Sequence, residues 1–379
     1  MQRLRRFLPF TLAALCFVVA GWFLPAAWCR RGAADWFRGS AATQSSLAQT
    51  VVLQGKGNLT VDDYKTGVPQ FSGEWLFGTH LMAGIGFCQM VSEHPELRAE
   101  LEPNIERCIQ QLLSKEVREF DRASWRADPL ENLEKGEGHA AYLGYLNFLL
   151  SLYRQLNPSN QFVALNDQLT ETLIRRMEQS GNGLIATYPG EWYAVDNTPV
   201  LASIAITGRL TNRGYSKFLA MEERIFRTQI IDRSSGLLIQ ALNQQGEALN
   251  SGRGSGSALG IFFLHHAFPE LSREIYGAIK RSLATNFLNY GAIREYPHGM
   301  IGPSDIDSGP ILFGYGFSAT GFTIGAARIY GDEEMYGRLY SSAILAGVPS
   351  RADGRLNFLA GGSLGNAILL AVLTAPAQP

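Results

Sequence analysis

Residues 294–321, REYPHGMIGPSDIDSGPILFGYGFSATG, contain the pattern that decides the fold of this chain. The stretch opens as a polar loop that holds two carboxylates one residue apart, Asp305 and Asp307. It then runs directly into a Gly-rich apolar segment, which we expect to form a buried helix beginning near Pro310. The same order, a long polar loop before an apolar helix, recurs along the chain and predicts a repeat architecture.

Five further apolar, Gly/Ala-rich segments resemble the one that begins near Pro310. They begin near Gly73, Gly138, Asn197, Ser255 and Ser363. A more charged, amphipathic segment follows each of the first five apolar helices, and such segments are typical of helices with one wet face. These predicted outer helices are Glu96–Glu116, Gln161–Ser180, Tyr215–Ile231, Leu271–Tyr290 and Glu333–Ala346.

Six inner helices and five outer helices leave one outer position empty. Thr43–Gln54 is the natural candidate to fill it, because it would close the N-terminal end of the domain against the C-terminal end. The sequence therefore predicts an all-α fold, an (α/α)6 toroid of helical hairpins. The connections into the inner helices are long and rich in Gly, Pro and acids, and long loops of this kind are often functional. We expect all of them at one mouth of the toroid, and we expect two strands within Gly236–Asn250.

The N-terminus has the pattern of an export segment. Three arginines within the first six residues precede an apolar run from Phe7 to Trp28, and Arg30 and Arg31 follow it. The run is close to the length that spans a bilayer, so we prefer an uncleaved anchor to a cleaved signal peptide. We therefore assign 1–31 to a signal or transmembrane anchor, 32–40 to a linker and 41–379 to the toroid. The body is expected in the periplasm or on the extracellular side.

The composition excludes several functional classes. The chain has 379 residues and a formal net charge of −1, so no electrostatic field favours nucleic acid as a partner. Only Cys88 and Cys108 lie in the body of the chain, too few for a disulfide framework or a four-cysteine zinc site. They form either one bridge or, as we prefer, two buried thiols. No metal-ligand spacing or dinucleotide fingerprint appears, so we predict neither a metal nor a cofactor.

The acids of the predicted mouth are the candidate catalytic residues. Asp305 and Asp307 lie just before a helix start, where one of them could serve only as a cap. Glycosyl chemistry needs two carboxylates across a cleft, so a partner must come from another loop. The loop YPGEWYAVDN at 188–197 offers Glu191 and Asp196, although Asp196 could also be a cap. His139, at the start of an inner helix, is a further catalytic candidate or a structural residue.

The predicted substrate-binding residues are mostly aromatic or basic side chains near these acids. We expect the following residues to contact the substrate: Trp75, His80, Tyr142, Tyr188, Trp192, Tyr193, Arg294, Tyr296 and His298. Arg294 could instead form a surface ion pair with Glu295, which would contribute little. Glu74 opens the first inner helix beside Trp75 and could line the same mouth.

The repeated hairpins resemble the six-hairpin glycosidase-like folds. Three segments, 138–156, 188–197 and 314–332, are similar to the linalool dehydratase/isomerase family. That resemblance implies an exported (α/α)6 protein that acts on a tertiary allylic alcohol, with a role for His139 and a homo-oligomer that binds substrate between protomers. Where that family has a cysteine at each end of the second segment, this chain has Tyr188 and Asn197. The stretch from 294 to 310 also resembles uncharacterised bacterial membrane-anchored proteins.

Three functions follow from the sequence. The first is a glycosidase-like enzyme that uses carboxylate acid/base catalysis on a carbohydrate or similar small molecule. The second is a lyase or isomerase of the linalool type, which predicts a small closed apolar pocket. The third is a noncatalytic helical-repeat module that binds a glycan or a protein of the cell envelope.

Overall fold

The structure is a computed structural model that describes residues 17, 20, 21, 23–131, 133–306 and 308–377. Most of the apolar run predicted as an anchor, and also Asp307, lie outside the described residues. Within those described ranges, no helix is both long enough and apolar enough to cross a membrane.

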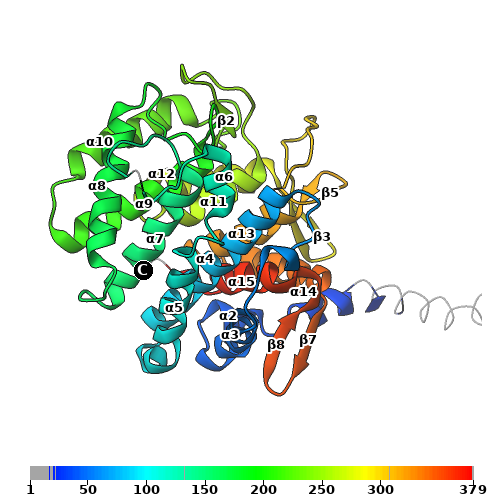
Figure 1. Cartoon of the computed structure of the whole chain (residues 1–379). Coiled ribbons are helices and arrows are strands. Elements are labelled where there is room, and N and C mark those ends of the chain that lie inside the picture. The colour runs from blue at the N-terminus through cyan, green and yellow to red at the C-terminus, as the bar shows by residue number, and fades with distance from the viewer. Residues whose placement is uncertain (1–16, 18–19, 22, 132, 307, 378–379) are drawn as a thin grey trace, which may run out of the picture.

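Six inner helices form a closed ring in the described part of the chain. They are α4 (Pro69–Glu93), α7 (Ala140–Leu156), α9 (Ala194–Thr211), α11 (Gly254–Leu264), α13 (Phe317–Ile329) and α15 (Gly362–Leu373). Each inner helix packs on the next one in this order, and α15 packs back on α4 (Figure 1). The predicted ring closure is therefore confirmed.

The outer helices pack around this ring with the predicted alternation. They are α3 (Ala41–Lys56), α5 (Arg98–Leu112), α8 (Val163–Gln179), α10 (Ser216–Ile225), α12 (Pro269–Ser282) and α14 (Glu333–Gly347). The five from α5 to α14 each contact the inner helix that precedes them, and α3 packs on both α15 and α4. The sixth outer position is thus filled by the N-terminal helix of the domain, and the fold is an (α/α)6 toroid.

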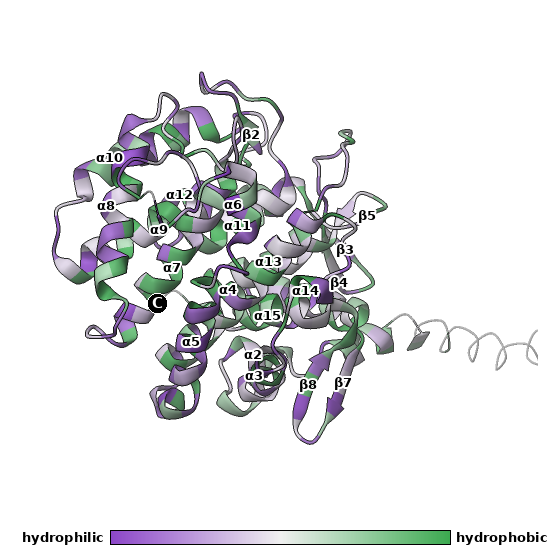
Figure 2. Ribbon diagram, viewed as in Figure 1, coloured by the Kyte–Doolittle hydropathy of each residue, from purple (hydrophilic) through white to green (hydrophobic). Residues whose placement is uncertain are grey.

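The difference in composition between the two rings has a physical cause. Inner helices are surrounded by other helices, so they are apolar on every side, whereas outer helices keep one polar face toward water (Figure 2). Small residues let the inner helices approach closely. A Cβ added to Gly144 would lie 2.6 Å from Val200 Cγ2, and one added to Gly86 would lie 2.7 Å from Leu370 Cγ. Gly86 and Gly144 are therefore required by packing.

The long connections lie at the end where the inner helices begin. They contain α6 (Glu119–Trp125), η1 (Val61–Asp63), η4 (Leu359–Gly361) and four antiparallel strand pairs. The pairs are β1 (Trp192–Tyr193) with β2 (Ala241–Leu242), β3 (Ala284–Phe287) with β4 (Tyr290–Ile293), β5 (Ile311–Leu312) with β6 (Tyr315–Gly316), and β7 (Pro349–Ala352) with β8 (Arg355–Phe358). We call this end of the toroid the loop end.

Two predicted helix boundaries were wrong, because in each case a β-hairpin is formed by residues that were expected to be helical. The helix expected from Pro310 begins at Phe317, because 311–316 form the β5–β6 hairpin with a turn at Phe313 and Gly314, both at positive φ. The outer helix expected to reach Tyr290 ends at Ser282, since 284–293 form the β3–β4 hairpin. Within Gly236–Asn250, the strand β2 pairs with β1 from another loop, and isolated bridges join the rest.

Other short elements complete the chain. The segment 32–40, predicted as a linker, contains α2 (Ala33–Phe37), whose Trp36 is buried and whose Phe37 packs edge-on against Tyr336 of α14. A single π-turn, η3 (Phe226–Ile230), continues α10, and η2 (Pro95–Leu97) joins α4 to α5. Cys88 and Cys108 are buried free thiols, in line with the preferred reading of the sequence.

Candidate active site

Two carboxylates and two tyrosines meet at the loop end, and we call them the carboxylate–tyrosine cluster: Glu74, Tyr145, Tyr188 and Asp196. Tyr188, from the loop before α9, donates a short hydrogen bond to Glu74 Oε1 on α4. Burial raises the pKa of Tyr188 well above its ordinary value, and the neighbouring charges of Glu74 and Asp196 raise it further. Tyr188 is therefore a neutral hydroxyl donor that lies close to both carboxylates.

Asp196 is held from its other side by Tyr145 of α7. The Tyr145 hydroxyl donates to Asp196 Oδ1 at 2.9 Å, and the Tyr145 ring packs edge-on against Phe263, with centroids 5.4 Å apart. An apolar surrounding of this kind fixes the ring and therefore the position of the hydroxyl. The cluster thus connects three inner helices, because Tyr145 bonds α7 to α9 and the loop residue Tyr188 bonds α4.

Asn197 explains why this loop has a defined position. Its Oδ1 accepts a bond from the Ile185 backbone N–H at 2.8 Å, and its Nδ2 donates to the Ile185 carbonyl at 3.0 Å. The side chain is fully buried. Asn197 therefore ties the loop to α9, and the preceding Asp196 can face the tyrosines instead of acting as an anchor for the loop.

A buried Asp–His pair lies at the start of α7. His139 Nδ1 lies 2.5 Å from Asp121 Oδ2, and the His139 ring packs on Trp125 with centroids 4.8 Å apart. Gly138 and His139 both have positive φ, which is uncommon for a non-glycine residue and orients the ring toward α6. Burial raises the pKa of Asp121, while the bond to His139 opposes this shift.

The Asp–His pair is connected to the carboxylate–tyrosine cluster through Trp125. The Trp125 indole N–H donates to the Thr187 carbonyl at 3.2 Å, directly before Tyr188. Arg176 supports the same turn by donating to the Gly138 carbonyl at 2.8 Å. The Asp–His pair and the carboxylate–tyrosine cluster therefore belong to one region of the loop end.

The predicted acid Asp305 belongs to a different arrangement, which we call the arginine cluster: Arg253, Glu295 and Asp305. Arg253 Nη1 lies 2.7 Å from Asp305 Oδ2, and its Nε lies 3.3 Å from Glu295 Oε1. Burial would raise the pKa of Asp305, but the bonds from Arg253, Ser308 and Gln240 together outweigh this effect and hold the pKa below its ordinary value. Burial raises the pKa of Glu295, and Ser255 and Arg253 offset part of the shift.

Asp305 is further fixed by two neutral donors. Gln240 Nε2 donates to its Oδ2 at 3.0 Å, and the Ser308 backbone N–H donates to its Oδ1 at 2.8 Å. Every carboxylate oxygen of Asp305 thus accepts a bond from the protein itself. This environment is typical of a carboxylate that fixes a loop.

The other predicted residues of the 188–197 loop lie near the carboxylate–tyrosine cluster, and their side chains differ in how far they are exposed to solvent. Glu191 is exposed and exchanges backbone bonds with Tyr188 at the tip of the loop. Trp192 and Tyr193 form β1 and are half-buried. Trp75 of α4 is also half-buried and packs edge-on against Tyr64.

Three residues of the 294–298 stretch lie in the connection between α12 and α13. Arg294 stacks over the Tyr315 ring at 5.6 Å, and the Tyr296 hydroxyl donates to the Pro303 carbonyl at 2.8 Å. His298 is exposed. The structure brings none of these three into a hydrogen bond with the carboxylate–tyrosine cluster among the residues that it describes.

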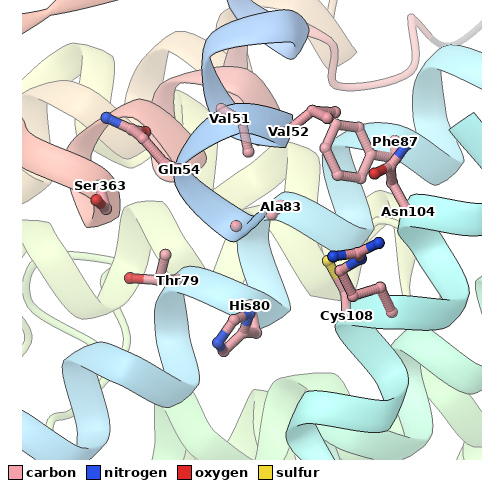
Figure 3. A pocket seen from close by; sticks show the side chains of 12 residues that line it. Val51, Val52, Gln54, Thr79, His80, Ala83, Phe87, Asn104, Cys108 and Ser363 are labelled. Carbon is pink, nitrogen blue, oxygen red and sulfur yellow. The ribbon is translucent and has the colours of Figure 1, made fainter. Parts of the chain in front are cut away.

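Two predicted substrate-binding residues face outer helices. Tyr142 is fully buried and donates to the Leu112 carbonyl of α5 at 2.8 Å, so it packs between helices. His80 lines a cavity of about 20 Å³ between α3, α4 and α5 (Figure 3). This volume suits a water molecule and not a sugar. Burial lowers the pKa of His80 to about 4, and its Nε2 has no partner among the described residues.

Asp121, Trp125 and Arg253 take part in these sites but were not among the predicted residues. Asp121 is 18 residues from His139, and Arg253 is 52 residues from Asp305, so no local motif links either pair. A usable signal for Arg253 was its position at the start of an apolar helix, where a buried arginine requires an acidic partner. Across the residues with assigned positions, no group of three His, Cys, Asp or Glu side chains could hold a metal ion.

No protein-family model matches the sequence. Among solved structures, the chain is similar to a possible member of the GH105 family from Salmonella enterica, with a TM-score of 0.54, 12% identity and coverage of 89% of this chain and 94% of that one. It is also similar to a GH76 alpha-mannanase from Bacteroides thetaiotaomicron, with a TM-score of 0.51, 9% identity and coverage of 78% and 85%.

A third similar structure is an inactive variant of the alpha-1,6-mannanase GH76A of Salegentibacter sp. HEL1_6 in complex with alpha-1,6-mannotriose. Its TM-score is 0.51 at 12% identity, and the match covers 90% of this chain and 99% of that one. At such identities the likeness shows the fold alone. It supports the six-hairpin glycosidase-like part of the predicted resemblance, while the linalool-type part stays a prediction.

Proposed function

We propose that this protein is an exported, membrane-anchored enzyme that cleaves a carbohydrate by carboxylate acid/base catalysis at the loop end of its toroid. The observation that carries the proposal is the position of Tyr188. Its hydroxyl bonds Glu74, and the nearby charge of Asp196 contributes to its raised pKa. Two carboxylates from different inner helices are thereby gathered at one place. Glycoside hydrolysis needs such a pair, one as general acid and the other as base or nucleophile.

The tyrosines have a specific part in this mechanism. Hydroxyl donors orient a carboxylate without cancelling its charge, which suits the proposed exchange of a proton by Glu74 and Asp196. Tyr145 and Tyr188 are positioning residues in this account, because each acts through the carboxylate that it bonds. Trp75, Trp192 and Tyr193 are half-buried aromatic side chains near the cluster and are the proposed walls for sugar rings.

We propose that Asp305 fixes its loop, whereas its sequence pattern suggested a catalytic role. An acid bonded by Arg253, Gln240 and Ser308 would have to lose these bonds before it could serve as a base. We therefore propose that Glu74 takes the place of Asp305 beside Asp196 as the second catalytic carboxylate. Asp307 stays a candidate whose contribution a variant can test.

The proposal is tested by measuring sugar release from alpha-1,6-manno-oligosaccharides and a broad panel of other oligosaccharides. Wild-type protein should hydrolyse at least one member of the panel, and Glu74→Gln and Asp196→Asn should abolish that hydrolysis. Hydrolysis by the Asp307→Asn and Glu191→Gln variants is measured in the same assay. Binding of a glycan without turnover by the wild type would instead support the noncatalytic binding module, and full activity of both main variants would refute the proposed roles.

A second candidate function, a lyase or isomerase of the linalool type, is favoured by the Asp121–His139 pair. Asp121 occupies Nδ1 of the imidazole, which leaves Nε2 for proton transfer. This function predicts turnover of a tertiary allylic alcohol, with loss of activity in His139→Gln and retained activity in Glu74→Gln. Product analysis by gas chromatography would distinguish this result from glycan hydrolysis.

A further inference from the structure

Large apolar side chains are exposed along the connection between α12 and α13. In the part of this connection that the structure describes they are Phe287, Met300, Ile301, Leu312 and Phe313, and together with Phe317, the first residue of α13, we call them the apolar flank. Ile301 is 100% exposed and Phe313 86%. Single exposed apolar residues are ordinary, whereas a gathering of them marks an interaction surface.

The connection that carries the apolar flank is one structural unit. The hairpins β3–β4 and β5–β6 lie side by side, joined by a backbone bridge between Arg294 and Tyr315. Glu295 adds a bond from its backbone N–H to the Gly314 carbonyl at 2.9 Å. Phe287 and Phe313 stand next to the turns of these two hairpins. Phe287 and Phe313 are therefore presented by the turns of two adjoining hairpins.

The N-terminal segment joins the body beside the same hairpins. The Tyr290 hydroxyl contacts Cys29 Sγ at 3.6 Å, and Tyr290 is the strand partner of Phe287. Arg30 packs against Gly337 of α14, where an added Cβ would lie 2.5 Å from Arg30 Nε. Figure 1 shows the blue N-terminal segment leaving the body on the side where β3 and β5 lie.

The residues at this junction have the character of a membrane–water boundary. Trp28 is 65% exposed, and the Arg31 guanidinium stacks over its ring at 4.3 Å. Tryptophan and arginine are favoured where an apolar helix leaves the lipid, and Trp28 ends the apolar run that begins at Phe7. Tyr290 contacts this junction, and the segment 284–294 around it contains no acid and ends in Arg294, which suits an anionic lipid surface.

We infer that the apolar flank lies against the lipid bilayer, as a second membrane contact of the body beside the predicted N-terminal anchor. The predicted anchor is the reason for choosing lipid as the occupant, because the apolar run that ends at Trp28 is followed by Cys29, which contacts Tyr290, the strand partner of Phe287. Apolar hairpin tips can enter the headgroup region one side chain at a time, as interfacial anchors do. The inference is independent of the proposed catalytic function.

The test uses the full-length chain reconstituted in vesicles of phosphatidylethanolamine and phosphatidylglycerol. An environment-sensitive fluorophore is attached at Phe287→Cys or Phe313→Cys in a Cys16→Ser background, in which Cys29, Cys88 and Cys108 are buried. Spin-labelled lipid should quench both positions at least twofold. Met221→Cys is the matched control, because Met221 is an exposed apolar residue, 47% accessible, on α10, far from the N-terminal segment (Figure 1).

Each other outcome would overturn the inference. Equal quenching at all three positions, or none at any of them, would show that the flank has no specific contact with lipid. Disulfide-linked dimers through Phe313→Cys without lipid quenching would assign the flank to a second copy of the chain. Failure of every variant to float with vesicles would remove the anchor on which the argument depends.

Discussion

The two acidic clusters of the loop end differ in the groups that hold their carboxylates. Glu74 and Asp196 accept bonds from tyrosine hydroxyls, whereas Glu295 and Asp305 share the buried Arg253. Both clusters lie where connections enter inner helices, and both combine residues that are far apart in the sequence. The difference between them is therefore one of chemistry and not of location.

This comparison shows why the presence of acids in a sequence does not identify the reactive ones. A guanidinium neutralises the carboxylates around it and stabilises the loop that carries them. A tyrosine hydroxyl directs a carboxylate and leaves its charge available for a substrate. We therefore assign a structural role to the arginine cluster and the chemistry to the carboxylate–tyrosine cluster, and the two roles predict opposite patterns of activity and stability.

The largest expected effect is on catalysis. Glu74→Gln and Asp196→Asn should each lower kcat/KM on a hydrolysed glycan by about 1000-fold or more, because a positioned acid or base contributes roughly 10²–10⁴. Asp305→Asn should lower it by less than about 10-fold, because its partner Arg253 acts on the loop and not on the substrate. Initial-rate kinetics on the three purified variants check this contrast, and a larger loss in Asp305→Asn would reverse the two assignments.

The next effect is on stability and concerns Arg253. Arg253→Met should lower the free energy of unfolding by about 3–5 kcal/mol, because it leaves the buried Glu295 and the neighbouring Asp305 without a cation. Arg294→Met, which loses a stacking contact with Tyr315, should cost about 1 kcal/mol. Urea unfolding followed by circular dichroism measures both values, and similar costs for the two variants would speak against a structural role of the arginine cluster.

Glu222 gives a third case for the comparison, because neither an arginine nor a tyrosine bonds to its carboxyl group among the described residues. It is fully buried, and both of its carboxyl oxygens are without a partner among the described residues. Burial raises its pKa to about 7, with a contribution from Glu178. The folded state therefore favours the protonated form, so this group should destabilise the protein progressively as pH rises from about 4.5 to about 7.

Glu222→Gln should remove that pH dependence. At pH 8 the variant should be more stable than the wild type by roughly 3–4 kcal/mol, while at pH 4 the two should be similar, since the pKa of Glu222 is raised from 4.5 to about 7 and each pKa unit corresponds to about 1.4 kcal/mol. Unfolding curves at the two pH values test this, with Glu223→Gln as the control, because Glu223 is a half-buried neighbour on α10 that pairs with Arg227. An equal difference at both pH values would mean that Glu222 does not titrate in this range.

The smallest effect is expected for the positioning tyrosine. Tyr145→Phe keeps the ring packed on Phe263 and removes the bond to Asp196, so the stability should fall by about 1 kcal/mol. We expect kcat to fall about 10-fold with KM nearly unchanged, because the hydroxyl orients the carboxylate and does not bind substrate. A change confined to KM would indicate that Tyr145 contacts the substrate directly.

The architecture could be predicted because it depends on local patterns. Apolar Gly-rich segments such as Gly138–Tyr153 alternate with amphipathic ones, and this alternation is set by which faces are buried. The wrong helix start at Pro310 has a local cause as well. Proline often begins a helix, but the turn at Phe313 and Gly314 is stabilised by pairing with the neighbouring strand, which the periodicity of a single segment does not reveal.

The site could be predicted only in part because its chemistry depends on contacts between distant residues. The loop at 188–197 was identified from its acids and aromatics, and Asp196 and Tyr188 lie in the cluster. The role of Asp305 could not be inferred, since Arg253 approaches it from another connection. His80 and Tyr142 have the spacing of mouth residues, but the rotation of their helices turns them toward α5 and its neighbours.

The most direct test of the central claim is a crystal structure of the Glu74→Gln/Asp196→Asn double variant in complex with an oligosaccharide that the wild type cleaves. The account predicts that the glycosidic oxygen of the cleaved bond lies between the side chains of residues 74 and 196, with Tyr188 beside it. A sugar bound next to Arg253 and Asp305, with the carboxylate–tyrosine cluster unoccupied, would contradict it.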